Sequence, residues 1–375
     1  MRSGQMKEVK PGKRRILIWI LSGFVLLILA ALAVFFFVLA QKQNIVNELS
    51  FEQCLNYSTE NNPDAKIGVV IVKDNAANIS FYGNNGGRIP YDAYEFEIGS
   101  LTKTITAALI LRAESDGVLL LSDSIDRFLK LPKQAYYPTI QRLLTHQSGY
   151  QEDYFEKPMI SNFFTGGNSY YNITQSMMRR RIGNVHLQGR DYPFRYSNFG
   201  MSTLGMVLEE VYQQSYTDLV NAYVQQELGM QHTHVSDGTG NLSGYWNWAA
   251  DDAYIPAGAL ISTADDMAIY ARAMLSGSQE ALAHAQLPLA KIDATTEQLA
   301  QYGIRMDSAG AAWMIDDERG IVWHNGGTSN FSCYMGFDPA RQIAVVVLTN
   351  LSPDYRIPAT VLGAKLLIEL QDAAH

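Results

Sequence analysis

Residues 95–109 read EFEIGSLTKTITAAL. A polar turn gives way here to a run whose apolar residues recur at the spacing of an α-helix. If that helix begins near Gly99, Ser100 and Lys103 stand one turn apart on the same face. Their polar ends can then meet, which is the spacing needed if the lysine is to take a proton from the serine.

A lysine at this place needs an explanation, because the macrodipole already makes a helix N-terminus positive. The same positive field disfavours the ammonium form and moves the amine toward acting as a base. No other serine in the chain has a lysine three residues after it. The motif alone still leaves a structural interpretation open, with Ser100 as a helix cap and Lys103 as a solvated first-turn residue.

A second unusual segment, residues 16–40, contains 25 residues without a charge. It is long enough to cross a bilayer. Six basic residues and one acidic residue precede it, so the positive-inside rule predicts that residues 1–15 form a cytoplasmic tail and that the chain after residue 40 lies outside. The predicted localisation is the cell membrane, with a single span.

A cleavable signal peptide ending at Val38-Leu39-Ala40 is the alternative, but secretory apolar regions run only about 7–15 residues. We therefore expect an uncleaved anchor at 16–40, a linker at 41–50 and one folded domain at 51–375. The whole chain has 375 residues, which is enough for one large domain.

The folded domain is strongly acidic. The chain carries a formal charge of −8, and the basic tail contributes +5 (six minus one), so the remainder is near −13. This balance argues against nucleic acid and against anionic membrane surfaces as binding partners. It is compatible with a positively charged substrate.

Neither the cysteines nor the histidines predict a metal or cofactor site. Cys54 and Cys333 could form a disulfide outside the cytoplasm, but we do not expect their geometry to allow it. His232 and His234, with Asp237 nearby, fall in a predicted turn rather than in a ligand cluster. We therefore expect no metal and no cofactor.

Strand patterns stand at both ends of the domain, and helical patterns fill the middle, from about residue 106 to 290. The predicted strand pairs are 65–74 with 78–83, 311–316 with 320–324, and 331–337 with 342–348. The predicted helices include 51–60, 139–144, 201–213, 216–228, 263–275 and 359–371. This order indicates an α+β fold, in which distant parts of the chain form one sheet around a helical insertion.

Two further motifs could complete a site around Ser100. Tyr196-Ser197-Asn198 opens an apolar helix, where a loop can hold polar side chains rigidly. His324-Asn325-Gly326-Gly327 lies between two predicted strands, and its glycines allow the backbone to approach a ligand closely. A backbone N–H can then point at a substrate oxygen.

The order Ser-x-x-Lys, Tyr-x-Asn, His-x-Gly resembles the serine penicillin-binding protein and class C β-lactamase superfamily. The segment LLTHQSGY at 143–150 is also similar to the corresponding segment of that family's sequences. The resemblance runs from about residue 50 to 370. It implies a five-stranded antiparallel sheet flanked by helices, with a mainly helical subdomain beside it and the site in the cleft between them.

The resemblance also implies roles for individual residues. Ser100 is the expected nucleophile, and Lys103 and Tyr196 share the general-base and proton-shuttle work. Asn198 is expected to hold Lys103 and a polar group of the substrate. The backbone N–H groups of Ser100 and Gly327 are expected to form the oxyanion hole.

The chain departs from the family pattern at His324 and Asn325. With Gly326, these residues are expected to bind substrate where many members carry Lys-Thr-Gly. Lysine and threonine there grip a free carboxylate, and a neutral imidazole and an amide are poorer at this. A histidine here resembles esterases and D-aminopeptidases of the superfamily. We expect acid to restore part of the grip by forming an imidazolium.

The sequence therefore predicts a membrane-anchored, extracytoplasmic serine hydrolase that works through an acyl-enzyme. The expected substrates are cell-envelope esters or amides of D-amino acids, such as D-alanyl esters of teichoic acid. A D,D-carboxypeptidase or low-affinity penicillin-binding protein acting on peptidoglycan is one alternative, and a non-catalytic cell-wall sensor is another. Trp246, Trp248 and Tyr254 could line the substrate cleft or could be ordinary core aromatics.

Overall fold

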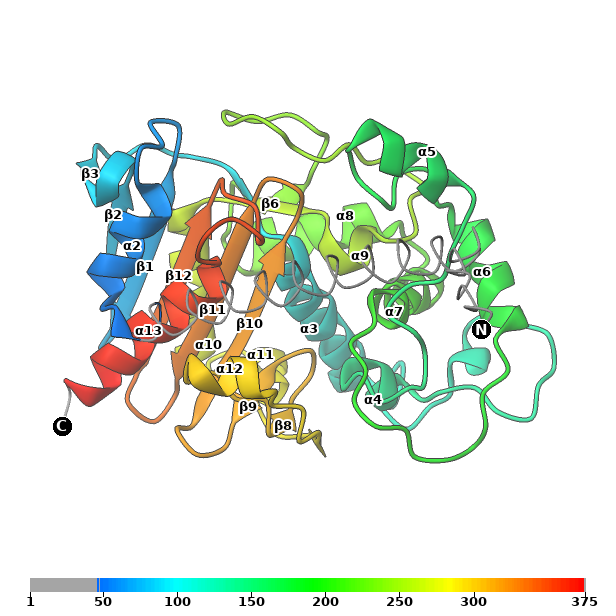
Figure 1. Ribbon diagram of the computed structural model, residues 1–375. Coiled ribbons are helices and arrows are strands. Elements are labelled where there is room, and N and C mark those ends of the chain that lie inside the picture. Colours follow the sequence, from blue (N-terminus) through cyan, green and yellow to red (C-terminus); the bar gives the residue numbers. More distant parts are fainter. Residues whose placement is uncertain (1–45, 47, 374–375) are drawn as a thin grey trace, which may run out of the picture. The chain divides into compact units, whose positions relative to one another are not determined.

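Figure 1 shows the computed structural model, which describes residue 46 and residues 48–373. The predicted anchor at 16–40 lies outside these residues. Within the described part of the chain, no helix has the length and apolar character needed to cross a bilayer. The chain divides into a unit of residues 1–49 and a unit of residues 50–375, and the second unit contains every element named below.

The second unit is built around an antiparallel sheet with the strand order β3-β2-β1-β12-β11-β10-β9-β8-β7. Its five long strands are β1 (Ile67–Lys73), β2 (Ala76–Tyr82), β10 (Ile321–Gly327), β11 (Ser332–Asp338) and β12 (Ile343–Thr349). Strand β1 pairs with β12 through Val70 and Val346, so the two ends of the domain meet in the middle of the sheet.

The α+β class is confirmed, but the expected count of five strands is wrong, because the sheet has nine. The additional strands are β3 (Arg88–Ile89), β7 (Ala290–Lys291), β8 (Ser308–Ala309) and β9 (Met314–Asp316). Strand β9 lies within the predicted strand 311–316 and pairs with β10 as expected. The other three have only two residues each, too few to leave an alternating pattern in the sequence. A separate three-stranded sheet has the order β4 (Phe96–Glu97), β6 (Leu260–Ser262), β5 (His234–Val235).

Helices cover the long strands on both faces. Strands β11 and β12 are buried at every position. Their sequences are therefore largely apolar throughout rather than alternating between apolar and polar residues. Figure 1 shows α2 (Phe51–Thr59) and α13 (Ala359–Asp372) in front of the sheet and α10 (Ala264–Ser276) behind it.

The helical part is organised around α3 (Thr102–Ser115), the helix predicted to follow Ser100. Eleven of its 14 residues are buried, because it is apolar on nearly all sides and must lie inside the domain. It packs against α7 (Asn198–Tyr212), α9 (Ile255–Gly258) and α11 (Glu280–Ala285). The other helices are α4 (Ile140–Leu144), α5 (Pro158–Thr165), α6 (Gln175–Asn184), α8 (Tyr216–Ala222) and α12 (Glu297–Gln301).

Most helix starts follow from local side-chain chemistry. Ser50, Thr139, Ser197 and Thr263 each cap a helix by accepting a hydrogen bond from a backbone N–H of the first turn. The predicted helix at 216–228 is different, because α8 ends at Ala222 and a π-helical turn, Tyr223–Glu227, continues it.

The sheet and the helical part meet where β10 passes the 3₁₀ turn Gly99–Leu101. A Cβ atom on Gly326 would lie 2.0 Å from the carbonyl oxygen of Ile98, and one on Gly99 would lie 2.6 Å from the backbone nitrogen of Gly327. Gly99 also has a φ of +46°, a conformation that suits glycine. The glycines therefore allow the backbone contact that brings Ser100 beside Gly327.

We expect Gly326→Ala to destabilise the protein by about 1–3 kcal/mol, the usual cost of overpacking a core. The added methyl group must displace the backbone at Ile98, so reactivity at Ser100 should fall as well. Gly167→Ala is the matched control, because its Cβ would have no neighbour closer than 3.9 Å. Urea unfolding followed by circular dichroism measures both, and equal midpoints for Gly326→Ala and wild type would contradict the proposed close contact.

Candidate active site

Ser100 lies in the 3₁₀ turn Gly99–Leu101, directly before α3, and its hydroxyl does not cap the helix. The Lys103 Nζ donates one hydrogen bond to Ser100 Oγ at 2.8 Å and another to the carbonyl oxygen of Ala257 at 2.6 Å. The two side chains therefore meet as the spacing predicted. The solvated-lysine interpretation is wrong, because Lys103 is fully buried.

The surroundings of Lys103 favour its neutral form. Burial lowers the pKa of its ammonium from 10.5 to about 7, and the negative charges of Asp153 and Glu152 oppose that shift. The main cause is therefore loss of solvent. Near neutral pH a large fraction of Lys103 can accept a proton from Ser100.

Tyr196 lies on the other side of this pair. Its ring centroid is 5.0 Å from Lys103 Nζ. Burial raises the pKa of its phenol, and a hydrogen bond with Ser100 only partly opposes that effect. At neutral pH the phenol is therefore protonated. Lys103 suits the part of proton acceptor, and Tyr196 suits that of proton donor.

His146, from the LLTHQSGY segment, holds the loop that carries Tyr196. Its Nδ1 accepts a hydrogen bond from the backbone N–H of Ser197 at 3.2 Å, and its ring centroid is 4.6 Å from that of Tyr196. Burial keeps the pKa of the imidazole well below its usual value, so the ring stays neutral. The sequence alone did not reveal its part in positioning Tyr196.

Asn198 has a different partner from the one the family resemblance implied. Its Nδ2 donates to the hydroxyl of Tyr170 at 2.9 Å, and that hydroxyl donates to Asp153 Oδ2 at 3.0 Å. Among the hydrogen bonds of the described residues, none joins Asn198 to Lys103. Asn198 thus fixes an aromatic wall of the pocket.

Glu97, inside the opening stretch of sequence, joins two walls of the site and was not singled out from the sequence. One carboxylate oxygen accepts from the backbone N–H of Trp246 at 2.6 Å, and the other accepts from Thr328 Oγ1 at 2.6 Å. Thr328 follows Gly327 directly. The buried carboxylate therefore ties the Trp246 loop to the end of β10.

His324 is buried, and its Nδ1 lies 2.6 Å from the carbonyl oxygen of Asn325. Burial, with the nearby charge of Lys103, lowers the pKa of the imidazole to about 3. The ring is therefore neutral at physiological pH, and the expectation that mild acid forms an imidazolium here is wrong. Asn325 is exposed, and its Nδ2 donates to Thr360 Oγ1 at 2.9 Å.

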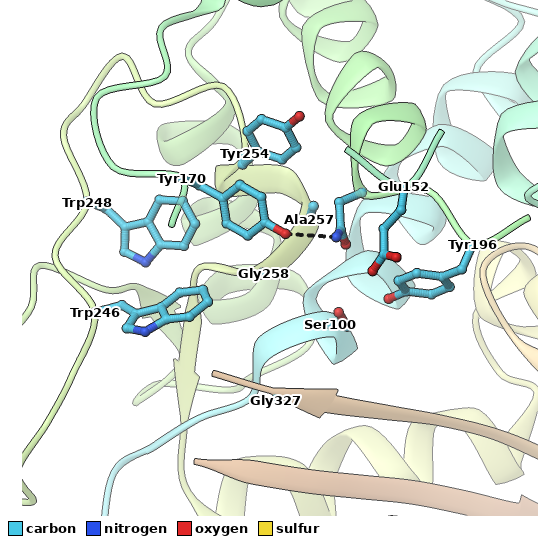
Figure 2. Close-up of a pocket in the computed structure, with 11 residues that line it drawn as sticks. Ser100, Glu152, Tyr170, Tyr196, Trp246, Trp248, Tyr254, Ala257, Gly258 and Gly327 are labelled. Carbon is cyan, nitrogen blue, oxygen red and sulfur yellow. Dashed lines mark hydrogen bonds between the residues drawn. The ribbon is translucent and has the colours of Figure 1, made fainter. Parts of the chain in front are cut away.

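Two cavities meet at Ser100, and both are also lined by Tyr196 and Gly327. The smaller, of about 200 Å³, carries the side chains shown in Figure 2. Its lining residues include Glu152, Tyr170, Asn198, Trp246, Trp248 and Tyr254. The cleft interpretation is therefore right for Trp246 and Trp248, whereas Tyr254 both lines the cavity and belongs to the buried core.

The larger cavity, of about 540 Å³, extends from Ser100 past His324, Asn325 and Gly326. Its apolar lining includes Phe194, Leu299, Ile304, Met306, Trp323 and Val361. The structure thus brings together every residue expected at the site, with a small polar and aromatic space on one side of Ser100 and a wide apolar space on the other.

The two cysteines and the possible metal ligands considered from the sequence take no part in the proton transfers at Ser100. Cys54 and Cys333 are both buried thiols, and Cys333 Sγ donates to the carbonyl oxygen of Ile98 at 3.0 Å. Within the described residues, no cluster of three or more histidine, cysteine, aspartate or glutamate side chains could hold a metal ion.

A family model described as Beta-lactamase matches residues 67–367. The chain is 23% identical over 279 residues to Protein flp of Staphylococcus aureus strain MW2, which covers 70% of this chain and 54% of that protein. The chain thus spans about half the length of the curated relatives it matches.

Solved structures share the fold at low identity. A Beta-lactamase/D-alanine carboxypeptidase from Yersinia pestis, complexed with citrate, superposes with a TM-score of 0.68 at 17% identity, covering 89% of this chain and 99% of that chain. A D-stereospecific amidohydrolase from Streptomyces sp. gives a TM-score of 0.61 at 18% identity, covering 80% and 94%. At these identities the likeness shows the fold alone.

We expect the reactivity of Ser100 to follow the protonation of Lys103. With a pKa of about 7, the neutral fraction of the amine rises from about 9% at pH 6 to about 91% at pH 8, a roughly tenfold gain. The rate of labelling by a fluorophosphonate should rise over this range and then level off. Lys103→Arg should label slowly at every pH, because a guanidinium stays charged.

The control for this measurement is Ser100→Ala, which reports labelling at other residues. A wild-type rate that is flat between pH 6 and pH 8 would show that Lys103 is not the base. If the labelling rate instead rises with pH only in the range below pH 5 and is level above it, His324 would be the base.

Proposed function

The chain belongs to the Beta-lactamase family of serine hydrolases, and we propose that it acts through an acyl-enzyme on cell-envelope esters or amides of D-amino acids. The observation that carries the proposal is the buried Lys103 amine, 2.8 Å from Ser100 Oγ, with a pKa of about 7. A lysine held as a base beside a serine serves nucleophilic catalysis. A non-catalytic sensor has no need of it.

The proposed reaction has two halves. Neutral Lys103 accepts the Ser100 proton as Ser100 Oγ attacks the substrate carbonyl, and the negative charge forms beside the backbone N–H groups of Ser100 and Gly327. The tetrahedral intermediate collapses, Tyr196 gives its proton to the departing alcohol or amine, and Lys103 restores the phenol. Water then attacks the Ser100 ester by the same route in reverse and releases the acid.

The substrate proposal follows from the charges of the site. His324 stands where a cationic lysine would grip a substrate carboxylate, and it is neutral, with a pKa of about 3. A carboxylate-bearing substrate therefore lacks its usual partner. The smaller cavity instead carries the carboxylate of Glu152. Both features suit an acyl group without a free carboxylate, such as D-alanine joined through an ester to teichoic acid.

We expect the purified protein to release D-alanine from D-alanylated teichoic acid at least roughly tenfold faster than it trims a stem pentapeptide or opens a chromogenic cephalosporin, because a missing charge-assisted hydrogen bond costs about 1.5–3 kcal/mol. The three assays run side by side at pH 7.5, with Ser100→Ala and Tyr196→Phe as inactive controls. Tyr171→Phe, a change at a half-exposed ring, should keep full activity.

Different outcomes of these assays separate the alternatives. Preference for the stem peptide would identify a D,D-carboxypeptidase. Normal turnover by Ser100→Ala would overturn the serine mechanism itself.

We further propose that residues 16–40 anchor the enzyme in the cell membrane with the catalytic domain outside. The absence of charge over these 25 residues and the basic residues before them support this topology. An outward enzyme held at the membrane is well placed for envelope substrates.

The proposed anchor predicts that the protein fractionates with membranes and that protease added to intact cells without a wall digests residues 50–375. Replacing four apolar residues of the segment with lysines should release the protein from membranes or stop its export, since each central lysine costs roughly 2.5–3.5 kcal/mol on insertion. Recovery of a mature form beginning at Gln41 would refute the anchor and leave export intact.

A further inference from the structure

The smaller cavity beside Ser100 is lined by one carboxylate and by no cationic side chain of the described residues. Glu152 lines this cavity together with Ser100, and Figure 2 shows its carboxylate pointing toward Ser100 and Tyr196. The neighbouring Glu156 pairs with Arg181 at 2.8 Å, whereas Glu152 enters no ion pair within the part of the chain that the structure describes.

Aromatic rings form the wall opposite Glu152 (Figure 2). The ring centroids of Tyr170 and Trp246 are 6.1 Å apart, and those of Trp246 and Trp248 are also 6.1 Å apart. Tyr254 stacks on Tyr170 at 4.4 Å and holds it in place. Aromatic faces combined with a carboxylate form an environment that attracts organic cations.

A second carboxylate adds to the negative field. Asp153 Oδ2 accepts a hydrogen bond from the Tyr170 hydroxyl. The buried Oδ1 of Asp153 has no hydrogen-bond partner among the described residues. The charges of Asp153 and Glu152 both act on Lys103. The other titratable groups around Lys103 are His146, His324 and Tyr196, which are all neutral at pH 7.

The excess of negative charge near Lys103 has its largest effect during catalysis. When Lys103 is neutral and ready to act as the base, the carboxylate of Glu152 lines a cavity none of whose lining side chains is cationic. We propose that the α-ammonium group of an aminoacyl substrate fills this place, with Glu152 as its counter-ion and Tyr170, Trp246 and Trp248 as its aromatic wall. The proposal rests on the hydrolase function above and specifies the acyl group that the enzyme selects.

The dimensions fit this assignment. An α-ammonium is separated from its carbonyl by a single carbon, and Glu152 and Ser100 line the same cavity of about 200 Å³. A small aminoacyl group such as alanyl suits that volume, and the cavity of about 540 Å³ on the other side of Ser100 then receives the leaving group.

The bound ammonium also prepares the base. It offsets the field of Glu152 and repels the proton on Lys103, and both effects lower the pKa of the lysine. A substrate with a free ammonium therefore increases the fraction of Lys103 that can accept the Ser100 proton, and an N-acylated substrate does not.

The test compares the p-nitrobenzyl esters of D-alanine and N-acetyl-D-alanine on the full-length protein. Wild type should favour the free ammonium by about tenfold or more in kcat/KM, the scale of a charge-assisted hydrogen bond. Glu152→Gln should lose roughly that factor for the D-alanyl ester, mainly through KM, and should not slow the N-acetyl ester. Glu152→Asp should restore part of the loss. Glu52→Gln, at an exposed residue of α2, is the matched charge control and should change neither substrate.

A second readout separates recognition from structural damage. Because Glu152 raises the pKa of Lys103, its removal should move the midpoint of fluorophosphonate labelling of Ser100 to a pH below that of wild type. If ester turnover is too slow to follow, protection of Ser100 from the fluorophosphonate by each ester gives the same comparison.

The proposal is overturned if wild type treats both esters alike, or if Glu152→Gln slows both equally. Failure of the proposed function would give a different result. Ser100 would not react with the fluorophosphonate, and neither ester would be hydrolysed or would protect Ser100 from labelling. Selective loss of the D-alanyl ester together with a lowered labelling midpoint supports the ammonium site.

Discussion

The hydrogen bond between Lys103 and Ser100, held out of water at the start of α3, is the interaction on which the site depends. Removing an ammonium from water is costly unless it is paired. Here the hydrogen bonds to Ser100 Oγ and the Ala257 carbonyl offset only part of that cost, and the remainder appears as a lowered pKa. The burial that makes α3 the centre of the helical part therefore also makes its lysine a base.

The second requirement is that three distant parts of the chain reach the same point. Ser100 precedes α3, Tyr196 precedes α7, and Gly327 ends β10. Glycine at 99 and 326 permits the backbone contact, and Glu97 fastens the Trp246 loop to Thr328. The rigidity of the site thus comes from buried polar contacts at the junction of sheet and helices, not from α3 alone.

The sequence predicted the parts of this structure that local physics controls. Long strands and capped helices were predicted because their periodicity and their serine or threonine caps depend only on residues close together in the chain. The short strands β7 and β8 were missed, since two residues carry no period. The buried charges were the hardest to predict. The neutrality of His324, the Tyr170 partner of Asn198 and the linking role of Glu97 depend on contacts between residues far apart in the chain.

Selectivity in this site follows from where charge is absent as much as from where it is present. A fixed cation at position 324 would have attracted carboxylates and would have stood beside Lys103, further lowering its pKa. With a neutral imidazole there, none of the described residues that line the small cavity is cationic, and Lys103, which bonds to Ser100, loses its charge to act as a base. The carboxylate of Glu152 in the cavity and that of Asp153 beside Tyr170 are then left without this positive charge, which favours a substrate that brings its own. The same two carboxylates that keep Lys103 partly protonated in the empty site make the arrival of such a substrate the event that releases the base.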